Sequence, residues 1–178
     1  MTSKTEIPMK KIAMVINGAG GVGKDTLCDL ADKHFGVMNI STITPIKEIA
    51  AQCGWDGTKD ARARKFLSDL KRLCVEYNDF PTNWALERYH EFLKDESLDI
   101  LFVHIREAGE IQKFVDATGG EAKTLLIRGG DRMKKSNYGN VSDDEVENYS
   151  YDYYFTNDKS LEETEVLFKE FLASILGG

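Results

Sequence analysis

The segment Gly18-Ala19-Gly20-Gly21-Val22-Gly23-Lys24-Asp25-Thr26 determines the fold that the sequence predicts. The apolar run 12–16 precedes it and predicts a buried strand. Apolar residues at helical spacing follow it: Leu27, Leu30, Ala31 and Phe35. A strand, a glycine-rich loop, a lysine, a threonine and a helix, in this order, predict a loop that binds the phosphates of a nucleotide.

The chemistry of this loop follows from its residue types. Glycines allow backbone N–H groups to curl around phosphate oxygens, and the start of the next helix adds a favourable dipole end. Lys24 adds a positive charge that can reach the β- and γ-phosphates. The residues that we expect to contact the nucleotide are Gly18, Gly20, Gly21, Val22, Gly23, Lys24, Asp25 and Thr26.

The end of the loop departs from the commonest pattern, in which Ser or Thr directly follows the lysine. Here Asp25 comes first and Thr26 second. This Lys-x-Thr order resembles nucleoside monophosphate kinases of the adenylate kinase type. We expect Thr26 and Asp25 to hold Mg²⁺, although Asp25 also suits the first turn of a helix simply as an acid.

Composition limits the class of protein. The 178 residues, 42% of them hydrophobic, predict one domain over 1–178 with a loose tail at 1–10. The net charge of -7 argues against nucleic acid or an anionic membrane as partner. No apolar run approaches the length of a membrane span, and no signal-peptide core precedes the first strand, so we expect a cytoplasmic protein with reduced cysteines.

Strands and helices alternate along the chain. The expected strands are 12–16, 37–40, 99–105, 123–127 and 153–156, and the expected helices between and after them are 44–53, 60–78, 82–94, 108–118 and one from 161. Two helix starts carry capping signals, Thr44 before Pro45 and the capping box Ser160–Glu163. The alternation predicts an α/β fold with a mainly parallel sheet, and the segment at about 129–148 has the length and composition of a lid.

Cations outside the loop are the next feature, because phosphoryl transfer depends on positive charge around the transferred group. The candidates are Lys47, Arg62, Arg64, Lys71, Arg106, Arg128, Arg132, Lys134 and Lys135. Arg106 and Arg128 follow strands, at the sheet edge where open α/β folds bind ligands. We expect Lys24, Arg106, Arg128 and Arg132 to be catalytic. Lys47, Arg64 and Lys71 are expected to bind the substrate.

Two further residues have alternative interpretations. His104 lies where a strand of this type usually carries an acid for Mg²⁺, so it is either a hydrogen-bonded core residue or a metal or phosphate contact. Asp25 would then supply the missing carboxylate. Trp55 lies in a Trp-Asp-Gly turn near basic residues, where it either belongs to the turn or stacks on a base.

Over about 11–171 the chain resembles the deoxynucleoside monophosphate kinases of phages and bacteria, with His104 where that family has Asp. The elements that carry the resemblance are Gly23-Lys24-Asp25-Thr26, Thr44-Pro45-Ile46-Lys47-Glu48, Gly54-Trp55-Asp56-Gly57 with Arg62 and Arg64, Ile105-Arg106-Glu107 with Glu110, Ile127-Arg128, Tyr151-Asp152-Tyr153, and Asn157-Asp158. The loop and topology are also similar to those of animal-type phosphomevalonate kinases.

The resemblance implies a three-layer α/β/α P-loop fold with five parallel strands in the order 2-3-1-4-5. It implies transfer of phosphate from ATP, with Mg²⁺, to a small-molecule acceptor, a nucleoside monophosphate in the first instance. Lys47, Arg64 and Arg106 would hold the acceptor phosphate, and Arg128 and Arg132 would close over the transferred group. A non-nucleotide acceptor and a nucleotide-binding switch with little transferase activity are the alternatives, and a homodimer is left open.

Overall fold

A computed structural model describes residues 10–130 and 145–178 of the protein. Five strands form one parallel sheet in the order β2-β3-β1-β4-β5. Their bounds are β1 Ile12–Asn17, β2 Val37–Ser41, β3 Ile100–His104, β4 Lys123–Gly129 and β5 Tyr153–Asn157. The predicted fold class and strand order are therefore confirmed.

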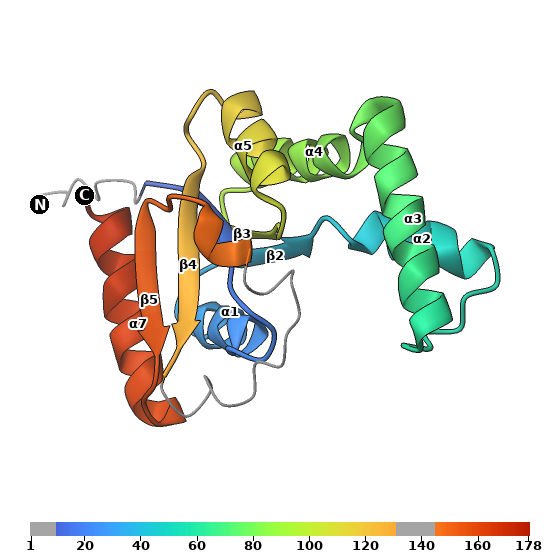
Figure 1. Ribbon diagram of the computed structural model, residues 1–178. Coiled ribbons are helices and arrows are strands. Elements are labelled where there is room, and N and C mark those ends of the chain that lie inside the picture. Colours follow the sequence, from blue (N-terminus) through green and yellow to red (C-terminus); the bar gives the residue numbers. More distant parts are fainter. Residues whose placement is uncertain (1–9, 131–144) are drawn as a thin grey trace, which may run out of the picture.

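Helices cover both faces of this sheet (Figure 1). Their bounds are α1 Lys24–Asp32, α2 Thr44–Gln52, α3 Ala61–Asn78, α4 Phe80–Lys94, α5 Ala108–Ala117 and α7 Leu161–Leu176, with a short 3-10 helix, η2, at Glu145–Asn148. Among the described residues, no helix has both the length and the apolarity that crossing a membrane requires.

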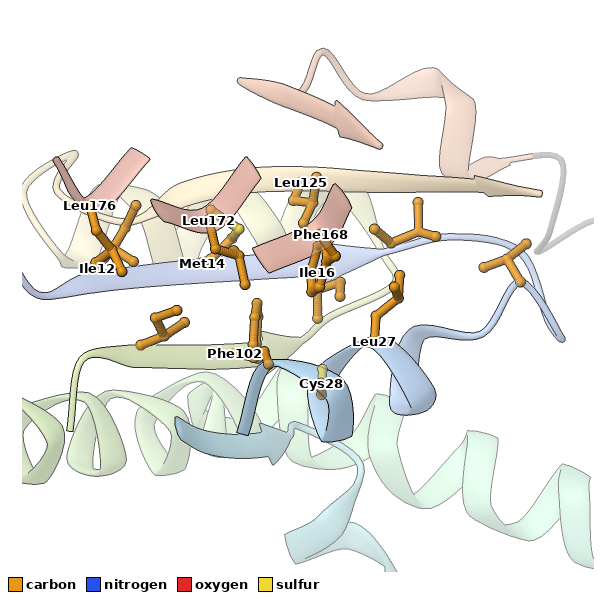
Figure 2. Close-up of a cluster of buried hydrophobic side chains, with 14 residues drawn as sticks. Ile12, Met14, Ile16, Leu27, Cys28, Phe102, Leu125, Phe168, Leu172 and Leu176 are labelled. Carbon is orange, nitrogen blue, oxygen red and sulfur yellow. The ribbon is translucent and has the colours of Figure 1, made fainter. Parts of the chain in front are cut away.

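The alternation of side chains along β1 divides the core into two clusters. Met14 and Ile16 face α1 and α7, where they meet Phe102 and Phe168 (Figure 2). Val15 belongs to the cluster on the other face, which α4 and α5 cover. Because every residue of β1 is buried, the loop that follows this strand starts from a fixed point in the molecule.

Side-chain caps define the starts of α3 and α7. The Asp60 carboxylate accepts a hydrogen bond from the Ala63 N–H at 2.8 Å and caps α3, and Ser160 forms the predicted capping box with Glu163. The expectation that Thr44 caps α2 was wrong. The N-cap is Ile43, Thr44 lies inside the helix, and no side chain caps that end.

Helices α2 and α3 lie at one end of the molecule, away from α7 (Figure 1). Helix α3 packs on α2 and α4, and none of its 18 residues is buried. The predicted lid at 129–148 lies mostly outside the described residues, as do Arg132, Lys134 and Lys135.

Candidate active site

The glycine-rich loop between β1 and α1 has a backbone that only glycine adopts readily. Gly18 has φ +155°, and a Cβ there would lie 2.6 Å from the Ile127 carbonyl oxygen. Gly23 has φ +90°, and a Cβ there would lie 2.7 Å from Asn157 Nδ2. Side chains at these two positions would therefore collide with β4 and with Asn157, in addition to straining the backbone.

The end of the loop leads directly into the amino-terminal end of α1. Gly23 is the N-cap of this helix, and no side chain caps it, so the approach of an anion to the helix start is not blocked by a capping side chain. Lys24 folds back over the loop, where its Nζ donates to the carbonyl oxygens of Gly18 at 2.6 Å and Ala19 at 3.1 Å. This combination of N–H groups and ammonium suits a phosphate.

Two asparagines hold the loop in place. The Nδ2 of Asn17, a buried residue, donates to the Arg106 carbonyl oxygen at 3.0 Å and to Tyr151 Oη at 2.9 Å, while its Oδ1 accepts from the Gly18 N–H. Asn157, at the end of β5, donates to the Val22 carbonyl oxygen at 2.9 Å. The loop is thus tied to the segment after β3, to Tyr151 and to the end of β5.

A cavity of about 770 Å³ extends from the loop to α3. It falls within the range of sites that bind small molecules. Five of the predicted cations line it: Lys24, Lys47, Arg64, Lys71 and Arg106. They come from α1, α2, α3 and the segment after β3, so the fold brings together residues that are far apart in the sequence.

Lys71 is engaged by two carboxylates of the α5 start. Its Nζ lies 2.6 Å from Glu107 Oε2 and 3.1 Å from Glu110 Oε2. The Glu107 contact is a hydrogen bond, whereas Glu110 Oε2 accepts none from the described residues, so this second contact is an ion pair without hydrogen-bond geometry. Lys71 lines the cavity, and the two glutamates offset its charge, so its predicted role in substrate binding stays a prediction.

The pKa values of these glutamates move in opposite directions. Burial favours the neutral form of Glu107, but the charge of Lys71 and its hydrogen bond outweigh this and lower the pKa. For Glu110, burial dominates and the neighbouring Glu107 adds to it, so the pKa is raised in spite of Lys71. Glu107, the member of the pair with the lowered pKa, is the one that lines the cavity.

His104 lies at the edge of the cavity and is part of a hydrogen-bonded group. Its Nε2 is 2.8 Å from Asn39 Oδ1, and because an amide oxygen only accepts, Nε2 carries the proton. Asp25 Oδ1 is 3.9 Å from the same nitrogen. Burial lowers the pKa of His104; Asp25 opposes this effect and Lys24 adds to it. The ring is thus a neutral, positioned residue at the place where an acid was expected.

Cys28, on α1, lies behind His104. Its Sγ is 3.8 Å from His104 Nε2, and burial, with Asp25 and Asp29 adding, raises the pKa of the thiol to about 12. It therefore stays a thiol at neutral pH, and its structural role outweighs any reactivity.

Arg128 is not brought into this cavity. Its guanidinium donates to both carboxylate oxygens of Glu147, at 3.1 and 2.8 Å, and lies 4.6 Å from the centre of the Tyr154 ring. The predicted role of Arg128 over a transferred group remains a prediction. Arg132 lies outside the described residues, so its predicted role also stays a prediction.

Trp84 and Glu107 are among the residues of the cavity that sequence reasoning did not assign to a site. Trp84 forms part of an apolar stripe on α4 and has no local signal that separates it from a core residue. Trp55, the tryptophan considered for stacking, instead donates its Nε1–H to the Thr58 carbonyl oxygen within its own turn. Glu107 directly follows Arg106, so its position beside a predicted ligand-binding residue was the available signal.

Asp25 and Thr26 fit the Mg²⁺ that such a site implies. The Asp25 side chain is 93% exposed at the cavity, and carboxylate and hydroxyl oxygens are ligands that Mg²⁺ accepts together with phosphate oxygens and water. Within 10–130 and 145–178, no three His, Cys, Asp or Glu side chains form a metal cage.

Comparison with known proteins identifies the fold. No protein family model matches the chain. No curated protein matches it either. Solved structures do match. The tunicamycin resistance protein of Deinococcus radiodurans has a TM-score of 0.54 at 8% identity, over 93% of this chain and 95% of that one. A gluconokinase from Sinorhizobium meliloti 1021 has a TM-score of 0.52 at 12% identity, over 95% of each chain.

A third structure, TT1252 from Thermus thermophilus, has a TM-score of 0.52 at 18% identity, over 93% of this chain and 98% of that one. At these identities the likeness concerns the fold alone. Together with the strand order and the loop after β1, it shows that this chain has the fold of the P-loop small-molecule kinases.

Proposed function

We propose that this protein transfers the γ-phosphoryl group of Mg·ATP to a small phosphorylated acceptor, a nucleoside or deoxynucleoside monophosphate in the first instance. The observation that carries the proposal is the single cavity that joins Lys24 of the loop to Lys47, Arg64 and Arg106. In the transfer, an oxygen of the acceptor phosphate bonds to the γ-phosphorus, the bond to the β–γ bridging oxygen breaks, and ADP leaves.

Different residues of the cavity would bind the phosphate donor and the phosphate acceptor. The loop N–H groups and Lys24 would hold the donor phosphates, with Asp25 and Thr26 toward the metal. Lys47, Arg64 and Arg106 would hold the acceptor phosphate. Positioned positive charge of this kind supplies most of the catalysis in phosphoryl transfer, so the chemistry does not require a protein base.

Trp84 supports a planar acceptor. Its indole lines the same cavity as the cations, and Arg88 approaches its ring at 5.5 Å from the centroid. A nucleoside monophosphate has both a phosphate for the cations and a flat base for an aromatic ring. A phosphorylated metabolite without a ring, such as phosphomevalonate, would use the cations only.

The test is ADP production from Mg·ATP against the common ribo- and deoxyribonucleoside monophosphates and phosphomevalonate. We expect one or a few monophosphates to stimulate ADP release. Stimulation by phosphomevalonate alone would move the acceptor to a non-nucleotide metabolite. The absence of stimulation by all of these acceptors would contradict the proposal.

Lys24→Ala is the sharpest variant for the same assay. We expect the stimulated rate to fall at least about 100-fold, because an essential positive charge at the transferred group is lost. The circular dichroism spectrum and Tm should stay close to those of the wild type, since the Lys24 ammonium donates to the Gly18 and Ala19 carbonyl oxygens of the loop and not to the core. Arg62→Ala, on the same helix as Arg64 but outside the cavity lining, is the matched control and should keep the rate.

The second candidate is a nucleotide-binding switch with little transferase activity. His104, which stands at the end of β3 in place of an acid, favours it. A thermal-shift titration separates the two, because each ligand that binds the folded state raises Tm. A kinase should show a larger shift with a non-hydrolysable ATP analogue and the acceptor together than the sum of the separate shifts, whereas a switch should respond to the ATP analogue alone.

A further inference from the structure

Two buried polar side chains, those of Asn17 and Tyr151, meet at the start of the glycine-rich loop. Asn17 ends β1, and Tyr151 lies between η2 and β5. Asn17 Nδ2 donates to Tyr151 Oη at 2.9 Å, and Tyr151 Oη donates in turn to the carbonyl oxygen of Val146, in η2, at 2.8 Å. The core of the molecule thus contains a short chain of hydrogen bonds between segments that are far apart in the sequence.

The direction of each hydrogen bond in this chain is fixed. A carbonyl oxygen only accepts, so the single hydroxyl proton of Tyr151 goes to Val146, and the phenol oxygen is left to accept from Asn17. The second N–H of the Asn17 amide goes to the Arg106 carbonyl oxygen at 3.0 Å, and Asn17 Oδ1 accepts from the Gly18 N–H at 2.9 Å. Only one orientation of the amide satisfies all of these partners.

The Asn17 amide connects the two halves of the proposed active site. Gly18 begins the loop assigned to the donor phosphates, and Arg106 is one of the cations assigned to the acceptor phosphate. The amide holds the backbone of one against the backbone of the other. Transfer requires the acceptor oxygen to lie in line with the γ-phosphorus, and a misplacement of about 1 Å can lower the rate about 100-fold.

The hydroxyl of Tyr151 has a fixed position from which to hold this amide. The Tyr151 ring makes edge contacts with Tyr149 and Tyr154, with centroids 5.1 and 6.0 Å apart, and its backbone N–H donates to Tyr154 Oη at 3.1 Å. Without the hydroxyl, one N–H of Asn17 and the Val146 carbonyl oxygen would both lose their partner in a buried place. Because unpaired buried polar groups are unfavourable, the amide would shift toward other partners.

We propose that Tyr151 is a positioning residue for phosphoryl transfer: its hydroxyl orients the Asn17 amide, and the amide places Arg106 relative to the loop. This role rests on the proposed function, which makes the loop the donor site and Arg106 part of the acceptor site. Tyr151 is not among the described residues that line the cavity, whereas Asn17 is, so Tyr151 acts through Asn17 and touches neither substrate.

The variant Tyr151→Phe tests this role, because it keeps the ring and removes only the hydroxyl. Rapid-quench single turnover with Mg·ATP and the acceptor measures the transfer step, and titration calorimetry measures the Kd of each substrate, with a non-hydrolysable ATP analogue as donor. We expect the transfer rate to fall roughly 10- to 100-fold. Both Kd values should stay within about three-fold of the wild type, since no contact to a substrate is removed.

The variant Tyr149→Phe is the matched control. It also removes one tyrosine hydroxyl, but this hydroxyl donates to Gln112 Oε1 at the surface, at 3.1 Å. The transfer rate should stay at the wild-type value. A Tyr151→Phe variant that has a lowered Tm and an unchanged transfer rate would show that the hydroxyl serves stability alone, and would overturn the proposal.

A second variant, Tyr151→p-aminophenylalanine, separates positioning from stability and covers the case in which Tyr151→Phe does not fold. The amino group can donate to the Val146 carbonyl oxygen as the hydroxyl does, but an aromatic amine accepts hydrogen bonds poorly, so Asn17 loses its acceptor. We expect a Tm near that of the wild type and a transfer rate reduced as in Tyr151→Phe. A wild-type transfer rate in this variant would contradict the proposal.

The wild-type protein distinguishes a failure of this role from a failure of the proposed function. If the wild type transfers phosphate to none of the acceptors, the proposed function is wrong and the role of Tyr151 in transfer is wrong with it. If the wild type is active and the transfer rate is unchanged in both Tyr151 variants, only the role of Tyr151 is overturned.

Discussion

At the scale of single residues, the site contains charges that are balanced locally. Lys71 extends from α3 to Glu107 and Glu110 at the start of α5. The pKa of Glu107 is lowered, whereas that of Glu110 is raised. A cation that the sequence assigns to substrate binding is therefore also a link between two helices. The two glutamates compensate its positive charge, so its attraction for an anionic ligand is reduced.

The two glutamates should change stability with pH in opposite ways. The lowered pKa of Glu107 contributes stability that is present above its unfolded-state pKa and is lost as pH falls through the folded one. The raised pKa of Glu110 has the reverse effect. Its contribution to stability falls as pH rises from the unfolded-state pKa through the folded-state pKa.

Two substitutions check these signs. Relative to the wild type, Glu107→Gln should lower Tm more at about pH 7 than at about pH 4. For Glu110→Gln, the difference in Tm from the wild type should be more positive at about pH 7 than at about pH 4. Differential scanning calorimetry across this range measures both. A Glu110→Gln variant that is most destabilised at the higher pH would show that its ion pair with Lys71 outweighs burial.

At the scale of elements, the loop after β1 depends on the end of β5. Gly23 and Asn157 approach so closely that the loop adopts its path only with glycine at that position. Asn157 belongs to the last strand, far from Gly23 in the sequence. The correct shape of the loop therefore requires the whole sheet.

Gly23→Ala should accordingly disturb both stability and nucleotide binding. We expect the free energy of unfolding to fall by roughly 1 to 3 kcal/mol, from backbone strain and the collision with Asn157. The Tm shift produced by ATP should also disappear. Gly109→Ala, in α5 with nothing within 4 Å of its added Cβ, is the control and should be neutral or stabilising by less than about 1 kcal/mol. Urea unfolding with and without ATP measures these effects, and an unchanged ATP response would contradict the expected role of Gly23.

The elements also show what could be predicted from the sequence. The loop, the strands and the capping box at Ser160 depend on neighbouring residues, so local patterns identified them. The meeting of Lys71 with Glu107 depends on how α3 packs across α4, which no local pattern encodes. Trp84 was missed for the same reason, because stripes that face the core and stripes that line a cavity have the same spacing.

At the scale of the whole molecule, burial is unevenly distributed. All six residues of β1 are buried, whereas α3 has no buried residue and packs only against other helices in its main contacts. Four of the residues that line the cavity, Arg64, Leu67, Ser68 and Lys71, thus belong to a helix without a buried residue. Segments with few buried contacts open most easily in native proteins.

Hydrogen–deuterium exchange should detect this difference. We expect the amides of α3 to exchange well before those of β1 and α1. Mass spectrometry of peptic peptides resolves these segments. Equal protection of α3 and β1 would mean that α3 opens only when the whole protein unfolds, contrary to its exposure.

The asparagine at the end of β1 has a consequence for how the protein tolerates mutation. Asn17 is 2% exposed; it uses its amide to donate to the Arg106 carbonyl oxygen and to Tyr151, and its oxygen to accept from Gly18. Aspartate has no donor, leucine has neither group, and glutamine is one methylene too long for the same cavity. In a library containing all twenty amino acids at this position, selected for folded protein by a split reporter, we expect asparagine to be recovered almost alone.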